Sequence, residues 1–411
     1  MSAQDDWPTA PDGSEYNGQD LLHLMHDGRS PFAERWDAGL LIREIEDHLA
    51  AQVVDIPAIS KGSNNYVIAR LARGDVNMPG YDGFTIDQQV PEVEFEAAVY
   101  ELLQSEPAIR ASRLLYHRVP VERPPPHLEK PVDIVGRRLL VFERADGDML
   151  AWRTPTPKQK AHVLAQSATI RAALFNFTPP LEFAAKWFLA RLFDQKPESL
   201  PVPVAPTRHF CIELFVSKIH ATIKSVGDMI GWEDDHQVVG PVAAAAKQSL
   251  LRLIPHIMPP ETTKKPTIYR LVLDHGDFGI HNMSITADDY RVTSVFDWET
   301  ECIVPAILSD PSMAVVVDLV TDEAAAPSVI RVPTDTTSNE HVKYMAWATQ
   351  YIDILYEKAP EYQSTIKAGR DARHLWFALR DWRGDDPEGY FGTLGTWAER
   401  RLGELTVNSE E

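Results

Sequence analysis

Apolar side chains recur along this chain at two spacings, and together they predict a mixture of helices and strands. In residues 36–52 and 91–104 they fall three and four positions apart, which is typical of amphipathic helices. Short apolar runs without that spacing predict strands, which lie at residues 66–71, 112–118, 137–144 and 269–274. Residues 282–285 and 291–296 flank a polar turn and predict a β-hairpin.

The order of these elements predicts an α+β protein with two lobes of different kinds. The predicted strands are concentrated before residue 145, whereas helical spacing dominates residues 145–260 and the stretch from the hairpin to about residue 402. The first 20 residues are polar and aperiodic. We therefore expect a flexible tail at 1–35, a small β-rich N-lobe at 36–145 and a larger, mainly helical C-lobe at 146–405.

One carboxylate falls on the apolar side of a predicted helix. On the helical wheel of residues 91–104, Glu94 and Glu101 share a polar face, while Glu96 lies on the arc of Val99 and Leu103. A carboxylate on an apolar face needs a partner, which would be a nearby Arg or Lys. The alternative is a boundary Glu that reaches solvent.

Composition limits the classes of partner. The 40 Lys and Arg residues against 60 Asp and Glu give a net charge of −20, which disfavours nucleic acid and anionic membranes and favours a cationic small molecule. The alternative is that the negative charge serves only to keep the protein soluble.

The two cysteines, Cys211 and Cys302, are expected to be free thiols, and the acidic start of the chain lacks a signal-peptide pattern. We therefore expect a cytoplasmic protein with no membrane span.

The candidate chemistry lies in two motifs around the predicted hairpin, HGDFGIHN at 275–282 and VFDWE at 295–299. The hairpin would bring Asn282 at its start close to Asp297 at its end, with Asp277 on the preceding loop. Carboxylate and amide oxygens suit Mg²⁺, and phosphoryl transfer needs a metal on the phosphates and a carboxylate that accepts the hydroxyl proton. The alternative is that Asp and Asn only form turns here.

Both motifs resemble the signatures of the aminoglycoside phosphotransferase and choline kinase family, in the form common among fungal members. The segment VEFEAAVYELL (93–103) is similar to the helix of the family's nucleotide lobe, and RRLLVFERADGDML (137–150) is similar to its interlobe strand and linker. The resemblance covers roughly residues 36–400 and implies a protein-kinase-like two-lobed fold that binds ATP and Mg²⁺.

The resemblance also implies roles for individual residues. It implies that Asp277 is the catalytic base, that His275 braces the catalytic loop, and that Asn282 and Asp297 are metal ligands. It matches Glu96 to the helix glutamate that pairs with a basic strand residue. The implied nucleotide contacts are completed by the strand arginines, the glycine turn and the linker, at Arg70, Arg73, Gly62 and Glu143. Glu299 follows the metal-binding Asp without an assigned role.

We therefore expect a phosphotransferase that moves the γ-phosphate of ATP to a hydroxyl of a small molecule. The family's strand lysine is absent here, and the turn before the strand, KGSNN (61–65), holds one glycine. These departures favour the alternative, a kinase-fold protein that has lost phosphotransfer and binds a ligand, regulates, or catalyses another reaction. A protein kinase is disfavoured because DWE replaces DFG at 297–299.

Two further features have both a functional and a structural interpretation. His281 would either contact substrate or be a variable loop residue. The acidic residues between 381 and 388, together with Trp382 and Tyr390, would either bind an amine or form a solvated loop. The sequence leaves the acceptor and the oligomeric state open.

Overall fold

The computed structural model shows how the predicted elements assemble. The structure describes residues 10–14, 18–29, 31, 37–54, 56, 69–72, 74–78, 81, 83–123, 133–190, 196–224, 235–261, 268–300 and 302–407. The chain divides into two compact units, one of Met1–Gln159 with Gly279–Glu299 and the other of Lys160–Phe278 with Thr300–Glu411. This division differs from the predicted lobes, because the hairpin belongs to the first unit and the boundary lies at residue 159 rather than 145.

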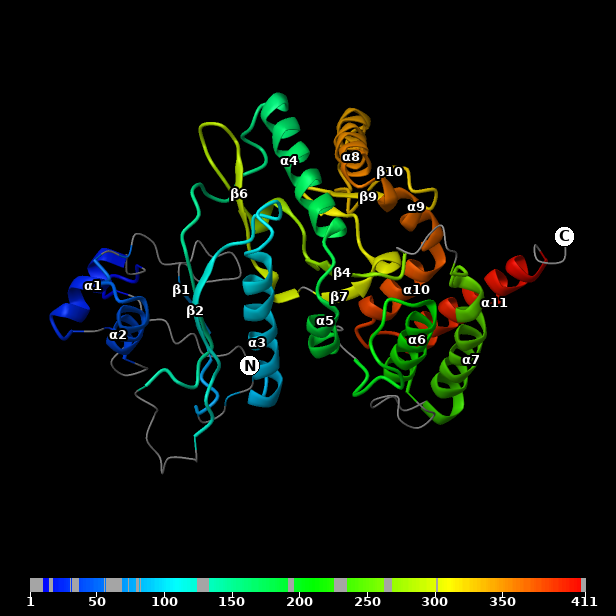
Figure 1. Ribbon diagram of the computed structural model, residues 1–411, viewed down its shortest axis with the longest axis horizontal. Helices are drawn as coiled ribbons and strands as arrows, with labels where there is room; N and C mark the ends of the chain where they lie inside the picture. The colour runs from blue at the N-terminus through cyan, green and yellow to red at the C-terminus, as the bar shows by residue number, and fades with distance from the viewer. Residues whose placement is uncertain are drawn as a thin grey trace. The chain divides into compact units, whose positions relative to one another are not determined.

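The first unit is built on a small antiparallel sheet and one long helix (Figure 1). The sheet has the order β1-β3-β2, with Leu71 opposite Leu139 and Arg118 opposite the same residue on the other side. All four residues of β3 are buried, because it is the central strand. The described strands are β1 (Ala69–Leu71), β2 (Leu114–Arg118), β3 (Leu139–Phe142), β5 (Met283–Ile285) and β6 (Val292–Val295), and the helices are α1 (Gly18–His26), α2 (Ala38–Leu49) and α3 (Ile86–Leu103).

The predicted hairpin is present as the antiparallel pair β5–β6. It is fixed to the first unit at two places. The Val295 amide donates to the Arg110 carbonyl at 2.7 Å, and the Asp148 amide donates to the Ile285 carbonyl at 3.0 Å. A side chain at Gly147 would collide with the hairpin, because its Cβ would lie 2.4 Å from the Ile285 carbonyl carbon. These contacts explain why the hairpin belongs to the first unit and not to the predicted C-lobe.

The predicted N-terminal tail contains a helix. Leu21 and Leu22 of α1 are buried, and Leu21 packs in a small apolar cluster with Ala38 and Ile134. The expectation of a flexible tail over 1–35 is therefore wrong for residues 18–26. The segment is polar on average, but its two adjacent leucines are buried.

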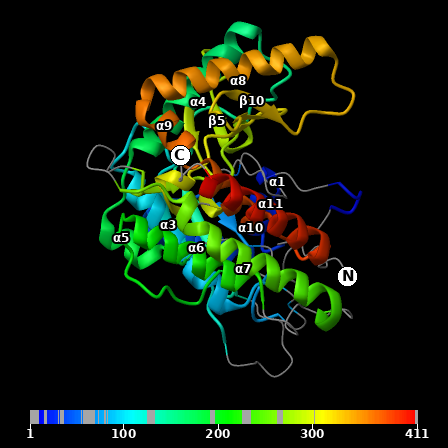
Figure 2. The same cartoon turned by 90° about the vertical axis from the view of Figure 1, so that its right-hand side faces the viewer.

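The second unit is mainly helical, as predicted, with two small sheets. Its helices are α4 (Pro157–Asn176, from residue 160 on), α5 (Leu181–Trp187), α6 (Arg208–Thr222), α7 (Gly240–Ile257), α8 (Ser338–Lys358), α9 (Pro360–Ala368), α10 (Arg370–Asp381) and α11 (Pro387–Val407). Helices α7 and α11 lie side by side in Figures 1 and 2. Their close approach uses Gly395, whose added Cβ would meet the Ala246 backbone at 3.0 Å.

The strands of the second unit differ from the sequence-based expectation. The predicted strand at 269–274 is β4 (Leu271–Asp274), and it pairs with β7 (Cys302–Pro305). A three-stranded sheet follows, made of β8 (Met313–Ala314), β9 (Asp318–Thr321) and β10 (Pro327–Ile330). Residues 302–330 are therefore strands and short turns, and the predicted helical spacing begins only at Ser338. Strands of two to four residues are too short to produce a clear period in the sequence.

Among the described residues, no helix is both long enough and apolar enough to cross a membrane.

Candidate active site

One arginine of the first unit gathers three carboxylates that are distant in sequence. Arg70 lies in β1, and its Nη1 is 3.1 Å from Glu96 Oε1 and 3.1 Å from Asp297 Oδ1. Its Nη2 pairs with Glu299, whose Oε2 also lies 3.6 Å from Arg138 Nη2. The predicted ion pair between Glu96 and a strand arginine is therefore present, and the arginine that makes it is Arg70.

The burial of this cluster strengthens the attraction between its charged groups. The side chains of Arg70 and Glu96 are 18% and 3% exposed, so little water screens their charges. Burial raises the pKa of Glu96, and the neighbouring Arg70 lowers it part of the way back. Burial alone would lower the pKa of Arg70, but the carboxylates of Glu96, Glu299 and Asp297 outweigh it and raise that pKa. The guanidinium is therefore a permanent cation of the site.

The hairpin brings Asn282 and Asp297 together, as the sequence predicted. Asn282 ends a 3₁₀ turn (η2, Ile280–Asn282), and its carbonyl accepts the Phe296 amide at 3.0 Å, one residue before Asp297. Asp297 has a left-handed backbone with φ of 64°, an uncommon conformation for a residue other than glycine. Trp298 anchors the turn because its ring is fully buried and its Nε1 donates to the Val295 carbonyl at 3.1 Å.

The loop His275-Gly276-Asp277 belongs to the second unit. His275 is fully buried, and its carbonyl accepts the Thr300 hydroxyl at 3.0 Å. Asp277 is exposed, so its carboxylate is accessible to a small molecule. Gly276 makes the turn possible with a φ of 79°, and a Cβ there would lie 2.1 Å from the Thr300 carbonyl oxygen. The loop therefore presents Asp277 at the end of β4 on a fixed backbone.

The ion pair that holds this loop was not predicted from the sequence. Arg171 of α4 and Asp274 of β4 are both buried, with Arg171 Nη2 3.0 Å from Asp274 Oδ1. The other carboxylate oxygen of Asp274 accepts the Asp310 amide at 2.7 Å. A helical wheel offered a signal, because Arg171 shares the buried face of Leu164 and Ala168. Asp274 is thus a buried structural anchor next to the motif.

Structures in which aminoglycosides or nucleotides are bound are similar to this chain. A ternary complex of streptomycin, ATP and APH(2″)-IIa is 11% identical with a TM-score of 0.42, over 89% of this chain and 95% of that one. A putative aminoglycoside phosphotransferase from Ralstonia eutropha is 12% identical with a TM-score of 0.36, over 89% and 99%. ADP-bound aminoglycoside phosphotransferase APH(2″)-Ib is 10% identical with a TM-score of 0.38, over 75% and 81%.

No family model matches the chain, and no curated protein matches it. These structures are described as aminoglycoside phosphotransferases, the family whose signatures the two sequence motifs resemble.

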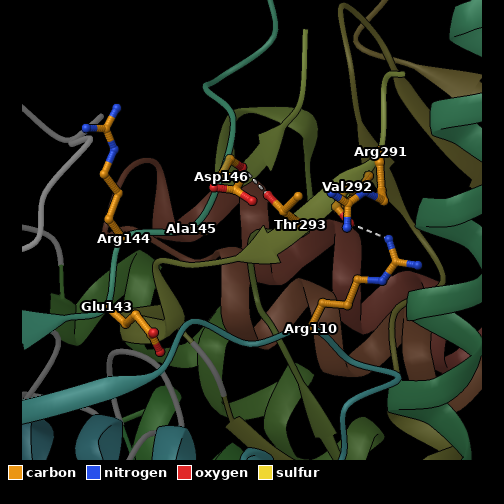
Figure 3. Close-up of a pocket in the computed structure, with 8 residues that line it drawn as sticks. All are labelled: Arg110, Glu143, Arg144, Ala145, Asp146, Arg291, Val292 and Thr293. Atoms are coloured by element: carbon orange, nitrogen blue, oxygen red, sulfur yellow. Dashed lines mark hydrogen bonds between the residues drawn. The ribbon is translucent and has the colours of Figure 1, made fainter. Parts of the chain in front are cut away.

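The remaining predicted nucleotide contacts fall partly outside the described residues. Gly62 and Arg73 lie outside them. Glu143 begins the linker after β3 and is exposed, and its Oε2 lies 3.5 Å from Arg113 Nη1. Together with Arg144, Ala145 and Asp146 it lines a pocket of the first unit (Figure 3). The structure therefore places Glu143 in the predicted linker, where its carboxylate pairs with Arg113.

The donor set fits Mg²⁺ better than a transition metal. Among the described residues, no group of three or more His, Cys, Asp and Glu side chains is placed to hold a metal ion. Asn282 directly precedes β5 and Asp297 follows β6, so the paired strands bring an amide and a carboxylate to the same end of the hairpin. Mg²⁺ characteristically takes one or two carboxylates and completes its shell with phosphate oxygens and water. This pair can serve such an ion only together with a phosphate ligand.

The structure resolves the alternatives for the acidic loop after α10. Trp382 is buried, and its ring packs on Tyr390 and Phe391 at centroid distances of 5.0 and 4.7 Å. Asp381 pairs with Arg380, and Asp386 accepts the Gly389 amide at the start of α11. These residues therefore have structural roles, and the Trp382 ring is not available to an amine.

Proposed function

We propose that this protein is an ATP-dependent phosphotransferase that phosphorylates a hydroxyl of a small molecule. The observation that carries the proposal is the Arg70 cluster, in which one strand cation contacts both Glu96 of α3 and Asp297 of the second motif. In phosphotransferases of the kinase type, a strand cation paired with a helix glutamate and a metal-binding aspartate must be in place together.

The charge of the cluster supports a role in binding phosphates through a divalent cation. Arg70 and Arg138 bring two positive charges to the carboxylates of Glu96, Asp297 and Glu299. The excess of acidic groups favours a cation over a bare anion. Asn282 and Asp297 would hold Mg²⁺, which neutralises phosphate charge when it is bound. Arg70, always charged and planar, would contact the phosphates beside it.

Asp277 would act on the acceptor. Its carboxylate would orient the hydroxyl and take the hydroxyl proton as the acceptor oxygen attacks the γ-phosphorus. One O–P bond forms, the bond from the γ-phosphorus to the bridging oxygen breaks, and ADP leaves with that electron pair. His275, the fully buried first residue of the same loop, would position Asp277 rather than touch the reacting atoms.

We propose an amine-bearing alcohol as the acceptor. The net charge of −20 attracts cations and repels acidic metabolites. Structures similar to this chain hold streptomycin or gentamicin, which supports a small-molecule acceptor in general. Glu143 and the linker after β3 would meet the adenine, which completes the proposed nucleotide site.

The test combines nucleotide binding with transfer. Calorimetry with ATP, with and without Mg²⁺, is compared for the wild type, Asp297→Asn, Asp277→Asn and the control Asp385→Asn, an exposed carboxylate of the second unit. We expect Mg²⁺-dependent binding in all but Asp297→Asn. ADP release with a panel of amino alcohols and neutral sugars should be lost in Asp277→Asn and retained in the control.

Each outcome decides between the hypotheses. ATP binding without phosphate transfer to any acceptor would favour the alternative, a kinase-fold protein without phosphotransfer. Absence of nucleotide binding would overturn the proposal altogether. Full turnover by Asp277→Asn would remove the assigned base while leaving the nucleotide site in place.

A further inference from the structure

Two basic side chains that have no part in the proposed reaction, Arg110 and Arg291, line a pocket of the first unit beside the linker. The pocket has a volume of about 560 Å³, within the size range of small-molecule sites. It is formed by Arg110, by Arg291 and its neighbours on β6, and by the linker from Glu143 to Asp146 (Figure 3). In this view the Arg110 side chain reaches Val292 beside Arg291, while Arg144 points away.

The backbone at Arg110 is held in a strained conformation. Arg110 has a φ of 57°, in the left-handed region that disfavours residues other than glycine, asparagine and aspartate. Hydrogen bonds to β6 hold the chain at Arg110 and just after it, because the Val295 amide donates to the Arg110 carbonyl and the Ser112 amide donates to the Val295 carbonyl. Strain of this kind concentrates at functional sites, where it aims a side chain.

Like charges meet at the same place. The Arg110 guanidinium donates to the Val292 carbonyl, one residue from Arg291. Burial and the charge of Arg291 both lower the pKa of Arg110. Arg291 has a carboxylate 3.6 Å away, on Asp289, but this pair is more than half exposed and therefore weak. Two cations thus share a pocket in a protein whose net charge is strongly negative.

We propose that this pocket binds a small organic phosphate, with the phosphate group between Arg110 and Arg291. Guanidinium groups bind phosphate oxygens through paired, charge-assisted hydrogen bonds. Glu143 and Asp146 bring carboxylates to the same lining. They repel a polyanion and accept hydrogen bonds from hydroxyl groups, so a hydroxylated phosphate monoester fits better than a polyphosphate.

The site goes beyond the proposed phosphotransfer and does not depend on it. It shares the linker with the proposed adenine contact, so an occupant would be placed to affect nucleotide binding. Its test therefore measures phosphate binding directly and never enzyme activity. Failure of the phosphotransfer proposal leaves this prediction intact.

The experiment is a calorimetric titration of the full chain with inorganic phosphate and with glycerol 3-phosphate, in a buffer of low chloride. Arg291→Gln should weaken the binding of both at least tenfold, and Arg291→Lys should restore part of it. The Arg291 side chain is exposed, so both variants should fold. Arg43→Gln, which removes an exposed arginine of α2, is the control for net charge and should bind as the wild type does.

Arg110→Asn provides a second line of evidence, because asparagine tolerates the left-handed backbone. It should keep the fold, as checked by circular dichroism, and lose phosphate binding. Unchanged phosphate affinity in Arg291→Gln, or no binding by the wild type, would overturn the site. Weaker binding of glycerol 3-phosphate than of inorganic phosphate would overturn the assignment of the carboxylates to ligand hydroxyls.

Discussion

At the scale of single residues, Arg70 shows how one strand arginine can join three carboxylates. The two ends of its guanidinium face different partners, with Nη1 on Glu96 and Asp297 and Nη2 on Glu299. A lysine has one nitrogen and could not span this set in the same way. Glu299, for which the sequence predicted no role, therefore pairs with Nη2 of Arg70 and also lies beside Arg138.

Removing this cation should destabilise the fold. Arg70→Gln leaves the buried Glu96 carboxylate without its main counter-charge, and breaking a buried pair typically costs 3–5 kcal/mol. We expect a loss of about 3 kcal/mol at pH 7, at the low end because Arg70 keeps some exposure. Urea unfolding measures it, and Arg113→Gln, which breaks the exposed pair with Glu143, should cost about 0.5 kcal/mol or less.

The same variant should change the dependence of stability on pH. The pKa of folded Glu96 already lies above its ordinary value of 4.5, and it should rise further without Arg70. A carboxyl with a raised folded pKa holds its proton better when folded, so stability falls as pH rises above 4.5. The gap between wild type and Arg70→Gln should therefore be small at pH 4 and wide at pH 7. A gap that narrows toward pH 7 would contradict the buried pair.

At the scale of elements, the turn after β4 decides where Asp277 lies. Gly276 has a positive φ and also lies against the backbone of Thr300, so a side chain is excluded for two reasons. Gly384, in the loop after α10, has a φ of 92° but no atom within 4 Å of an added Cβ. A substitution at Gly384 would therefore meet backbone strain alone, whereas one at Gly276 would meet backbone strain and a steric collision.

Alanine substitutions should reveal this difference. Gly384→Ala should cost about 1 kcal/mol through the left-handed backbone alone. Gly276→Ala should cost about 3 kcal/mol or more, because the collision with Thr300 adds to the strain. Thermal and urea unfolding of both variants provide the measurement. Equal losses would show that the Thr300 contact is not restrictive.

At the scale of the whole molecule, the charge of −20 acts on the stability of the folded state. Like charges on a compact surface repel one another, and this repulsion weakens as salt shortens the screening length from roughly 30 Å at 0.01 M to roughly 8 Å at 0.15 M. The ion pairs of Arg70 and Arg171 are buried and should be screened much less.

We therefore expect the melting temperature to rise as monovalent salt increases from 10 to 150 mM, because the screening length shortens roughly fourfold over this range. Differential scanning calorimetry in NaCl and in KCl would measure this, and agreement between the two salts would exclude a specific ion. A melting temperature that falls with salt would show that attractive surface pairs outweigh the net repulsion.

Local structure and candidate chemistry could be predicted from the order of the residues. Periodicity is a property of neighbouring residues, so the helix around Glu96, the strand before His275 and the hairpin after Asn282 could be predicted. The motif residues lie within 25 positions of one another, so their grouping was also visible. Elements with little apolar periodicity, such as α1 and β8–β10, were missed for the same reason.

Which charged side chains meet depends on how the fold brings distant parts of the chain together. Arg70 and Glu299 are 229 positions apart, and Arg171 and Asp274 are 103 apart, so no local pattern connects them. The hairpin belongs to the first unit because of backbone hydrogen bonds to Arg110 and Asp148. Such bonds can form whatever the side chains are, so the residue types do not reveal them. Long-range pairing is set by how buried surfaces fit together, and that fit emerges only when the whole chain has folded.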